Sequence, residues 1–578
     1  MTRRLRLAPL APLAPLALAA ALAACSSGPR QGADSAPRLT AAQGAALKSC
    51  EALATQFNFA GTRIDSAAPV AAGPVVQGSP PAPAHCLVKG RMNERKGSDG
   101  QDYAIGFEMR LPQAWNGRFY YQANGGIDGV VVPAQGALGG GPLTGALAQG
   151  FAVISSDAGH TGRQNPRFGA DPRARTDYGY NAVAALTPMA KGLIATAYGK
   201  GPDRSYIGGC SNGGRHTLVA AARIGEQYDG YLVGAPGYRL PNAALAQLWA
   251  VPQWAALATP GATRPHPFNP SATLPDLGTA LTADERQTVS RAIAGRCDAL
   301  DGARDGIVAD VAACQAAFDL ERDVPTCSGA RNGQCLTPGQ KRMLAAVHAG
   351  AQLPGGQPIY SRFPWDTGIA SANWAQWKFV NALVLDPAAG FIFMTPPRPV
   401  DPMKFDVADG FKAIYATDAS FPQSADATIA LPGKDDPVQL AALRGRGAKM
   451  LMYHGVSDPI FSAEDTVALM QRIDRVAQGR SAEFVRYFPV PGMAHCSGGP
   501  ATDQFDALGP LVRWVEQGEA PAGLMASARG AGNAGGANNE LPADWAAHRS
   551  RTLCAWPSVS RYKGSGSLDA ADSFVCSN

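Results

Sequence analysis

The sequence lacks the signatures of two large function classes. Its 51 Lys and Arg against 46 Asp and Glu leave a formal net charge of +5 over 578 residues, and no basic block is dense enough to predict nucleic-acid binding. No glycine-rich loop has the spacing of a phosphate-binding motif, which argues against nucleotide chemistry. We also find no internal repeat. Because the chain is too long for one compact core, we expect a core domain with a large insertion or a second domain.

The N-terminus has the features of an export signal. Three arginines precede an Ala/Leu/Pro stretch from Leu7 to Ala24, whose prolines favour a cleaved signal over a membrane-spanning helix. The stretch ends in Leu22-Ala23-Ala24-Cys25, which resembles a bacterial lipobox. We therefore predict a signal peptide over residues 1–25 with Cys25 as the lipidated first residue of the mature protein; ordinary cleavage after Ala24 is the alternative.

Residues 26–44 are then expected to form a flexible tether. The protein would be exported, either as an outer-membrane lipoprotein or as a periplasmic or secreted protein. It would meet the membrane only through its N-terminal lipid, and we favour a monomer.

A serine in the middle of the chain lies in a nucleophile-elbow motif. Gly209-Cys210-Ser211-Asn212-Gly213 has the form G-x-S-x-G, which holds a serine on a tight turn between a strand and a helix. Small flanking residues are needed because the backbone folds back on itself there. Residues 204–208 have a strand pattern and 214–222 a helix pattern. We predict that Ser211 is a nucleophile.

Predicted strands occur in two blocks on either side of a Pro-, Trp- and Gly-rich region. The strands are expected at 102–110, 118–122, 151–155, 205–207 and 230–234, and again at 449–454 and 483–489. The last two end at loops that hold Asp458 and His495, so the chain order is Ser, Asp, His, as in α/β-hydrolases. We predict an α/β-hydrolase catalytic core over 45–240 and 446–578, with a large inserted lid domain over 241–445.

His495 is the best candidate base among the eight histidines because it follows a strand and precedes a cysteine. Asp458 would accept the other imidazole N–H and fix the tautomer. Asp465 is the fallback acid, in a more helical setting. Three other histidines are interpreted as surface or satisfied core residues: His85, His160 and His348.

Oxyanion donors are expected from two places. One is the backbone N–H of Asn212, directly after the nucleophile, and the other is an N–H of the glycine-rich segment 122–126, where we choose Gly126. A plain turn is the alternative interpretation of that segment.

Cysteine spacing suggests a disulfide framework. Ten of the eleven cysteines remain after Cys25, an even number in an exported chain. Short separations suggest Cys50 with Cys86, Cys297 with Cys314, Cys327 with Cys335, and Cys554 with Cys576, which leaves Cys210 and Cys496. Counting alone cannot choose among the many pairings. If the last pair forms, it couples the turn of Ser211 to the loop of His495.

An acidic loop lies between Cys297 and Cys314. Asp298, Asp301 and Asp305 alternate with glycines that let backbone carbonyls point inward, an oxygen-rich arrangement that suits calcium. The spacing is not that of an EF-hand, and Asp-Gly pairs are also ordinary turn formers. The residues alone leave both interpretations open.

The region before Asp458 is rich in tryptophan. It contains five of the nine tryptophans: Trp249, Trp254, Trp365, Trp374 and Trp377. They can build a second core or wall a pocket for an aromatic substrate.

The elbow Gly-Cys-Ser-x-Gly-Gly, the His495-Cys496 pair and the loop Cys-Asp-x-Leu-Asp-Gly-x-x-Asp-Gly-Ile together resemble the tannase and feruloyl esterase family, from about Cys50 to Cys576. The resemblance is strongest to its bacterial members that cleave mono(2-hydroxyethyl) terephthalate. It implies an α/β-hydrolase core with a lid that carries a structural Ca²⁺, and all five disulfides named above. It also implies these roles: triad Ser211, Asp458 and His495; oxyanion donors Gly126 and Asn212; aromatic-ring contact Trp377; calcium ligands Asp298, Asp301 and Asp305 with the carbonyls of Ala303 and Ile307.

Two departures concern the substrate. Those bacterial members carry glutamate after the nucleophile, where this chain has Asn212. They also use a lid arginine to bind a free carboxylate, whereas no arginine occurs here between Trp377 and residues 395–397. Lys378 or Arg398 could replace it, although no motif says so, and bidentate pairing is special to arginine.

We therefore expect a serine esterase that cleaves feruloyl, galloyl or terephthalate monoesters through an acyl-enzyme, with the acid left open. A surface binding protein on a non-catalytic hydrolase scaffold is the alternative, and a peptidase on the same fold is a third hypothesis.

Overall fold

The computed structural model describes residues 40–77, 79–136, 143, 145–433 and 440–578, and Leu39–Asn578 form one compact unit. The predicted signal peptide, Cys25 and most of the predicted tether lie outside the described residues. Within the described ranges, no helix has both the length and the apolar character needed to cross a membrane.

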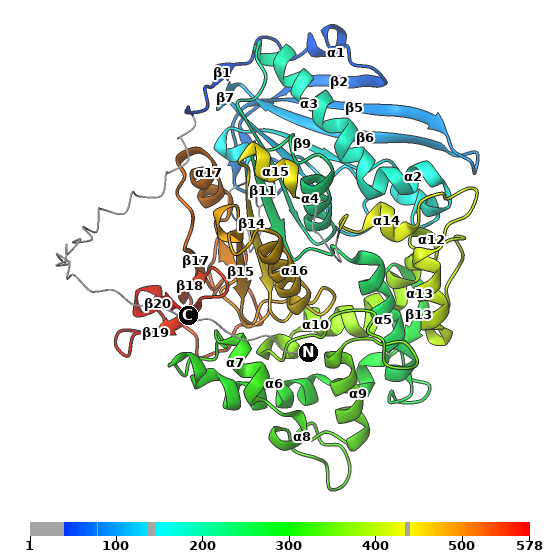
Figure 1. Cartoon of the computed structure of the whole chain (residues 1–578), viewed down its shortest axis with the longest axis vertical. Coiled ribbons are helices and arrows are strands. Elements are labelled where there is room, and N and C mark those ends of the chain that lie inside the picture. Colours follow the sequence, from blue (N-terminus) through cyan, green and yellow to red (C-terminus); the bar gives the residue numbers. More distant parts are fainter. Residues whose placement is uncertain (1–39, 78, 137–142, 144, 434–439) are drawn as a thin grey trace, which may run out of the picture. The chain divides into compact units, whose positions relative to one another are not determined.

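A nine-stranded sheet forms the centre of this unit (Figure 1), in the order β15-β14-β11-β10-β8-β9-β6-β5-β2. The strands are β2 (Thr62–Val70), β5 (His85–Lys96), β6 (Asp102–Pro112), β8 (Arg118–Gln122), β9 (Ala152–Ser156), β10 (Arg204–Cys210), β11 (Gly230–Gly234), β14 (Lys449–Gly455) and β15 (Val485–Val490). From β15 to β9 neighbouring strands are parallel, and from β9 to β2 they are antiparallel. All seven predicted strands are confirmed, and β2 and β5 were missed.

Both faces of the sheet are covered. In β8, Phe119 and Tyr121 pack in the cluster under α3 (Ala182–Tyr198), α4 (Asn212–Arg223) and α16 (Ala463–Val476). Tyr120 points to the other face, where α17 (Leu508–Gln517) and a small antiparallel sheet of β16 (Gln504–Phe505), β17 (Gly523–Ser527) and β18 (Ser550–Cys554) pack. Since both faces are buried, the central strands are apolar over most of their length, with polar residues mainly near their ends.

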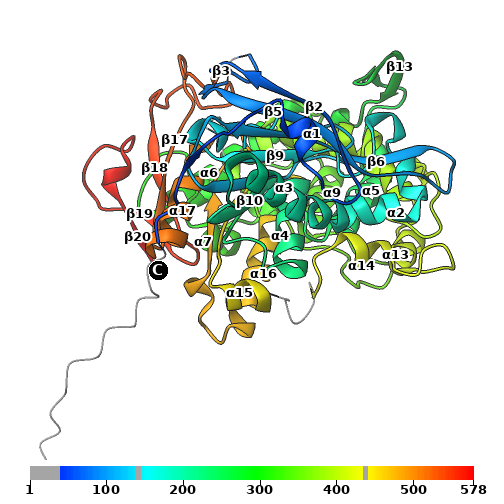
Figure 2. The same ribbon diagram turned by 90° about the horizontal axis from the view of Figure 1, so that it is seen from above.

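The long segment between β11 and β14 is mainly helical. Its larger helices are α5 (Leu240–Ala255), α6 (Ala283–Cys297), α9 (Pro338–Ala349) and α13 (Val407–Tyr415). A hairpin of β12 (Thr263–His266) and β13 (Asn269–Pro275) stands away from these helices (Figure 2). Trp254 and Trp374 lie buried in a separate hydrophobic cluster, so part of the tryptophan content builds a second core. The lid boundaries 241–445 stay a prediction.

All five expected disulfides are present. They join Cys50 to Cys86, Cys210 to Cys496, Cys297 to Cys314, Cys327 to Cys335, and Cys554 to Cys576. The other four bridges span 8 to 36 residues, whereas the Cys210–Cys496 bridge spans 286 residues and joins the end of β10 to the loop after β15.

Candidate active site

Ser211 lies on the turn between β10 and α4. Its φ of 66° and ψ of −127° are rare for a residue with a side chain, as a nucleophile elbow requires. The turn is held because the Ser211 amide donates to the Gly234 carbonyl at 3.0 Å. A Cβ at Gly209 would lie 2.2 Å from the Ala123 carbonyl oxygen and one at Gly213 2.3 Å from it, so both positions need glycine.

Three predicted residues meet at the ends of β10, β14 and β15. The Ser211 hydroxyl donates to Nε2 of His495 at 2.8 Å, and Nδ1–H of His495 donates to Oδ2 of Asp458 at 2.6 Å. This is the hydrogen-bond chain of a nucleophile, a base and an orienting acid.

Asp458 is buried and receives more than one donor. Its Oδ1 accepts the amides of Ile460 at 2.9 Å and Phe461 at 3.0 Å, and its Oδ2 also accepts from Nε2 of His454 at 3.2 Å. Burial alone would raise the pKa of Asp458, but the charge of His495 and these side-chain hydrogen bonds outweigh it and hold the pKa well below its usual range. The carboxylate is therefore ionised at neutral pH.

Two aromatic rings enclose the imidazole of His495. Trp377 and Phe461 contact it edge to face, with ring centroids 5.2 and 5.4 Å away. Trp377 belongs to a helical segment, Gln376–Asn381, of the insertion. The predicted tryptophan therefore lies beside His495, close to Ser211.

The bridge between Cys210 and Cys496 lies directly against this site. Each cysteine neighbours one of the two residues that share the 2.8 Å hydrogen bond, Ser211 and His495. Their Cα atoms are 6.1 Å apart. The bridge thus limits how far the elbow and the histidine loop can separate.

The segment with the predicted oxyanion donor crosses the elbow. A Cβ at Gly125 would lie 3.7 Å from the Cβ of Ser211, whereas one at Gly126, whose φ is +67°, would meet nothing within 4 Å. Gly126 therefore borders open space next to the nucleophile. Asn212 begins α4, so its amide belongs to the unpaired first turn of that helix.

The two cations considered for carboxylate binding are both occupied. Nζ of Lys378 is buried, donates to Gln247 at 3.3 Å and lies 4.1 Å from the ring centroid of Phe363. Burial lowers the pKa of Lys378 to about 7. Arg398 is ion-paired with Asp409. Neither presents an uncommitted charge to Ser211.

The three histidines interpreted as surface or core residues and the fallback acid take no part in this hydrogen-bond chain. His85, His160 and His348 are buried, and each bonds a backbone carbonyl. Asp465 accepts a hydrogen bond from Ser361. The geometry thus favours Asp458 over Asp465 as the partner of His495.

Two residues that the sequence did not single out hold the acid and base loops. His454 bonds Asp458, as described above. Asp366, from the insertion, accepts hydrogen bonds from the Ser457 hydroxyl and from the Gly492 amide, the latter at 3.0 Å. For His454, the only sequence feature that could have predicted its role was its position four residues before Asp458.

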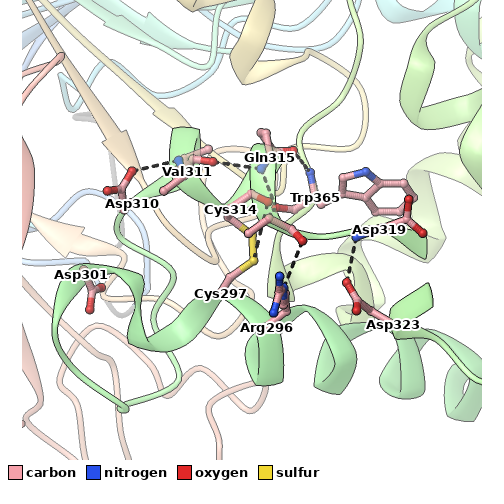
Figure 3. Close-up of a disulfide and its surroundings, with 12 residues drawn as sticks. Arg296, Cys297, Asp301, Asp310, Val311, Cys314, Gln315, Asp319, Asp323 and Trp365 are labelled. Atoms are coloured by element: carbon pink, nitrogen blue, oxygen red, sulfur yellow. Dashed lines mark hydrogen bonds between the residues drawn. A yellow bond between two sulfur atoms is a disulfide. The ribbon is translucent and has the colours of Figure 1, made fainter. Parts of the chain in front are cut away.

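The acidic loop lies beside the Cys297–Cys314 bridge. Figure 3 shows Asp301 in the stretch that leads on to Asp310. Asp298 accepts the amides of Asp305 and Gly306 at 3.1 and 3.0 Å, and Asp301 accepts the amide of Ala303 at 3.0 Å. Burial and the neighbouring carboxylates raise the pKa of Asp301 to about 7.

The donor set of this loop fits a hard cation chemically, with three carboxylates and adjacent carbonyls. One oxygen of Asp305 is hydrogen-bonded to Arg551. Within the part of the chain that the structure describes, no three His, Cys, Asp or Glu side chains converge as metal ligands. Calcium binding by Asp298, Asp301, Ala303, Asp305 and Ile307 therefore stays a prediction.

Residues 86–577 match the family described as "Tannase and feruloyl esterase". The chain belongs to this family. Mono(2-hydroxyethyl) terephthalate hydrolase from Piscinibacter sakaiensis is 37% identical over 557 residues, 89% of each chain. Feruloyl esterase C from Talaromyces stipitatus is 26% identical over 498 residues, 82% of each.

A solved structure agrees with these sequence matches. Feruloyl esterase B from Aspergillus oryzae superposes with a TM-score of 0.70 at 24% identity, covering 91% of this chain and 99% of that one. This likeness confirms the α/β-hydrolase fold. As a member of the tannase and feruloyl esterase family, the protein is a carboxylic ester hydrolase.

Proposed function

We propose that the protein is a serine esterase that cleaves esters of aromatic acids through an acyl-enzyme. The observation that carries the proposal is the pair of hydrogen bonds of 2.8 and 2.6 Å that link Ser211, His495 and Asp458. His495 takes the proton of Ser211 as the oxygen attacks the ester carbonyl, and it returns that proton to the leaving alcohol. Asp458 holds the tautomer and stabilises the imidazolium. Water then repeats the cycle on the acyl-enzyme.

The backbone amides of Gly126 and Asn212 are proposed to stabilise the oxyanion. Gly126 supports this role because it borders open space beside Ser211, and Asn212 because it opens α4. Removal of one such donor typically costs roughly 100- to 1,000-fold in kcat.

An aromatic acid is supported by Trp377 at the base and by the names of the relatives. Phenolic acids, feruloyl or galloyl, suit the site better than a terephthalate monoester, because Lys378 and Arg398 are both engaged elsewhere. A free carboxylate would be left without its usual cationic partner. The terephthalate monoester is the competing substrate, because the relative that is 37% identical is named for its hydrolysis.

Initial rates on methyl ferulate, methyl gallate and mono(2-hydroxyethyl) terephthalate decide among these acids. We expect kcat/KM to be highest for one of the two methyl esters. A clear preference for the terephthalate monoester would overturn the argument from the missing cation.

Ser211→Ala tests the nucleophile. We expect a loss of about 10⁴-fold or more in kcat, with the residual rate supplied by binding and the oxyanion donors. A serine-directed phosphonate should label the wild-type chain at Ser211. No labelling of a folded protein would favour the alternative, a binding protein on a non-catalytic scaffold.

We also propose that a structural Ca²⁺ binds the side chains of Asp298, Asp301 and Asp305 with the carbonyls of Ala303 and Ile307. When bound, the ion would neutralise the loop's charge. The disulfides support export, since such bonds persist in oxidising compartments. Lipidation of Cys25 is proposed in addition, and it predicts a detergent-soluble mature protein that Cys25→Ala renders water-soluble.

A further inference from the structure

We propose that Asp128 is a positioning residue that sets the spacing of the two oxyanion donors. Its carboxylate holds the glycine loop, defined here as residues 123–129, against the side chain of Asn212. The inference rests on the proposed function, because it concerns the proposed donors Gly126 and Asn212.

The glycine loop is fastened on both sides of its two exposed glycines. Before them, Asn124 donates through Nδ2 to Oγ of Ser155 at 3.0 Å and to the carbonyl of Ser156 at 2.8 Å, at the end of β9. After them, the Ile127 carbonyl accepts from Nε2 of His160 at 2.9 Å and the Asp128 carbonyl from Nδ2 of Asn165 at 3.1 Å. The Asp128 side chain adds the connection to α4. Gly125 and Gly126 thus span a short gap between two fixed points, and neither glycine has a side chain that could hold it.

Asp128 connects this loop to α4 through one oxygen. Its Oδ2 accepts Nδ2–H of Asn212 at 2.7 Å and Nε2–H of His216 at 2.9 Å. The Asp128 side chain is 2% exposed, so these bonds are shielded from water. Its φ of +54° is unusual for a residue other than glycine and persists only where the surroundings determine it.

Asn212 is itself held in one orientation. Its Oδ1 accepts Nε–H of Arg215 at 2.6 Å and the hydroxyl of Tyr178 at 3.2 Å, so its amide nitrogen must face Asp128. Arg215 is fully buried and balances the charge of Asp128. The side chain of the residue that supplies one donor is therefore bonded to the loop that supplies the other.

This connection matters because oxyanion donors act only at the right separation. A tetrahedral intermediate needs both N–H groups about 2.7–3.1 Å from one oxygen. Without the Asp128 carboxylate, the glycine loop keeps its anchors at Asn124 and along its main chain after Gly126, but it loses the side-chain bonds that set its distance from α4. The donor of Gly126 would then sample positions away from the oxyanion, while substrate binding beside Trp377 stays unchanged.

The test compares an ester with its thionoester, in which sulfur replaces the carbonyl oxygen and accepts hydrogen bonds poorly. In wild type we expect the oxoester to react much faster. In Asp128→Ala we expect kcat on the oxoester to fall about 10- to 100-fold, with KM within about threefold and with little change on the thionoester. The ratio of the oxoester rate to the thionoester rate should therefore fall by about the same factor as kcat on the oxoester.

Asn212→Ala keeps the backbone donor and removes only the side chain. We expect the same fall in the rate ratio. In the double variant Asp128→Ala/Asn212→Ala the ratio should fall no further, because both substitutions remove the same connection between Asp128 and Asn212. Additive losses would overturn the inference. Asp128→Asn, which keeps the shape and one acceptor oxygen, should lie between wild type and Asp128→Ala and serves if the latter does not fold.

Asp229→Ala is the matched control. Like Asp128, Asp229 is a buried carboxylate. It accepts a hydrogen bond from the Ser205 amide and is ion-paired with Arg446. Its removal should lower stability without changing the ratio. An unchanged ratio in Asp128→Ala, with Ser211→Ala inactive, would overturn this inference and leave the proposed function standing. Activity that survives in Ser211→Ala would instead overturn the proposed function, and the inference with it.

Discussion

His454 and His495 donate hydrogen bonds to the same oxygen of Asp458, from 3.2 and 2.6 Å. Nε2 of His454 also donates to the Phe461 carbonyl at 2.9 Å, and its Nδ1 accepts from the Thr466 hydroxyl at 2.8 Å. The second histidine is therefore held in place as a donor to Asp458 through Nε2. It shares the carboxylate oxygen that Asp458 presents to His495.

Replacing His454 by phenylalanine should change the pH profile as well as the rate. With one donor fewer, the carboxylate of Asp458 attracts the proton of His495 more strongly, so the acid limb of kcat/KM moves to higher pH. We expect kcat/KM at its optimum to fall about tenfold, since a hydrogen bond to a charged group is worth roughly 1.5–3 kcal/mol. His454→Gln, which can keep an N–H donor, should return the acid limb of kcat/KM to its wild-type pH. If the rate falls but the acid limb stays at the same pH, His454 contributes through packing and not through its hydrogen bond to Asp458.

Removing the Cys210–Cys496 bridge should lower activity more than calcium binding. The bridge flanks Ser211 and His495, whereas the acidic loop lies between Cys297 and Cys314. The double variant Cys210→Ser/Cys496→Ser should lose about 2–4 kcal/mol of stability and at least tenfold in kcat. A double Cys327→Ser/Cys335→Ser variant, which opens a separation of only 8 residues, should keep its activity. Equal loss of activity and calcium affinity in the first variant would mean that the bridge supports the whole fold.

Local patterns predicted the parts of the site that local physics determines. Ser211 was found because an elbow needs small residues at fixed offsets, and His495 and Asp458 because each follows a strand with a clear apolar pattern. The strand β2 was missed because it is the edge of the sheet, where its polar residues face solvent and weaken the pattern. The strand β5 lies between β2 and β6, and exposed Lys89, Arg91 and Glu94 interrupt its apolar pattern.

The supporting residues could not be predicted because their partners are distant in sequence. Asp128 bonds Asn212 across 84 residues, and Asp366 bonds Ser457 across 91. A buried carboxylate in a loop has no periodicity, and an Asp beside glycine is typical of any turn. Only the folded chain shows that Asp128 bonds the glycine loop to α4 and that Asp366 bonds the loop before Asp458.

Asp157 should make stability depend on pH. Burial, together with the neighbouring carboxylate of Asp128, raises its pKa to about 7, although three backbone amides, those of Gly159, Gly106 and Asp157 itself, oppose this rise. Because the folded pKa lies above the unfolded value, the stability from the neutral acid is full below about pH 4 and is lost as pH rises through about 7. Asp157→Asn removes this dependence and keeps an Oδ1 acceptor for the amides of Gly106 and Gly159.

Denaturant unfolding at two pH values measures the effect. Relative to wild type, Asp157→Asn should gain about 2–3 kcal/mol between pH 5 and pH 8. A difference that does not change with pH would show that Asp157 is already ionised at the lower value.

Calcium removal should destabilise the fold without abolishing the chemistry. A bound ion stabilises the folded state by RT ln(1 + [Ca²⁺]/Kd), which is about 2.7 kcal/mol at 100 times Kd. We expect a chelator to lower Tm by several degrees and excess Ca²⁺ to restore it. Asp301→Asn should show the low Tm with or without Ca²⁺. A wild-type Tm that neither treatment moves would contradict the calcium proposal.

Trp377 should contribute to selectivity for the acid group. Its ring is partly buried and meets the imidazole of His495 edge to face at 5.2 Å, so it lies close to the position that a flat acyl group on Ser211 would take. Trp377→Leu should raise KM about tenfold for methyl ferulate and little for an aliphatic ester such as ethyl butyrate, because aromatic pairs add about 0.5–1.5 kcal/mol beyond the area they bury. Trp374→Leu is the matched control, since Trp374 packs against Phe379 in the core of the insertion. It should lower Tm and leave the ratio of kcat/KM for the two esters unchanged. If Trp377→Leu also leaves that ratio unchanged, the tryptophan supports only the histidine, and aromatic selectivity must come from another wall of the site.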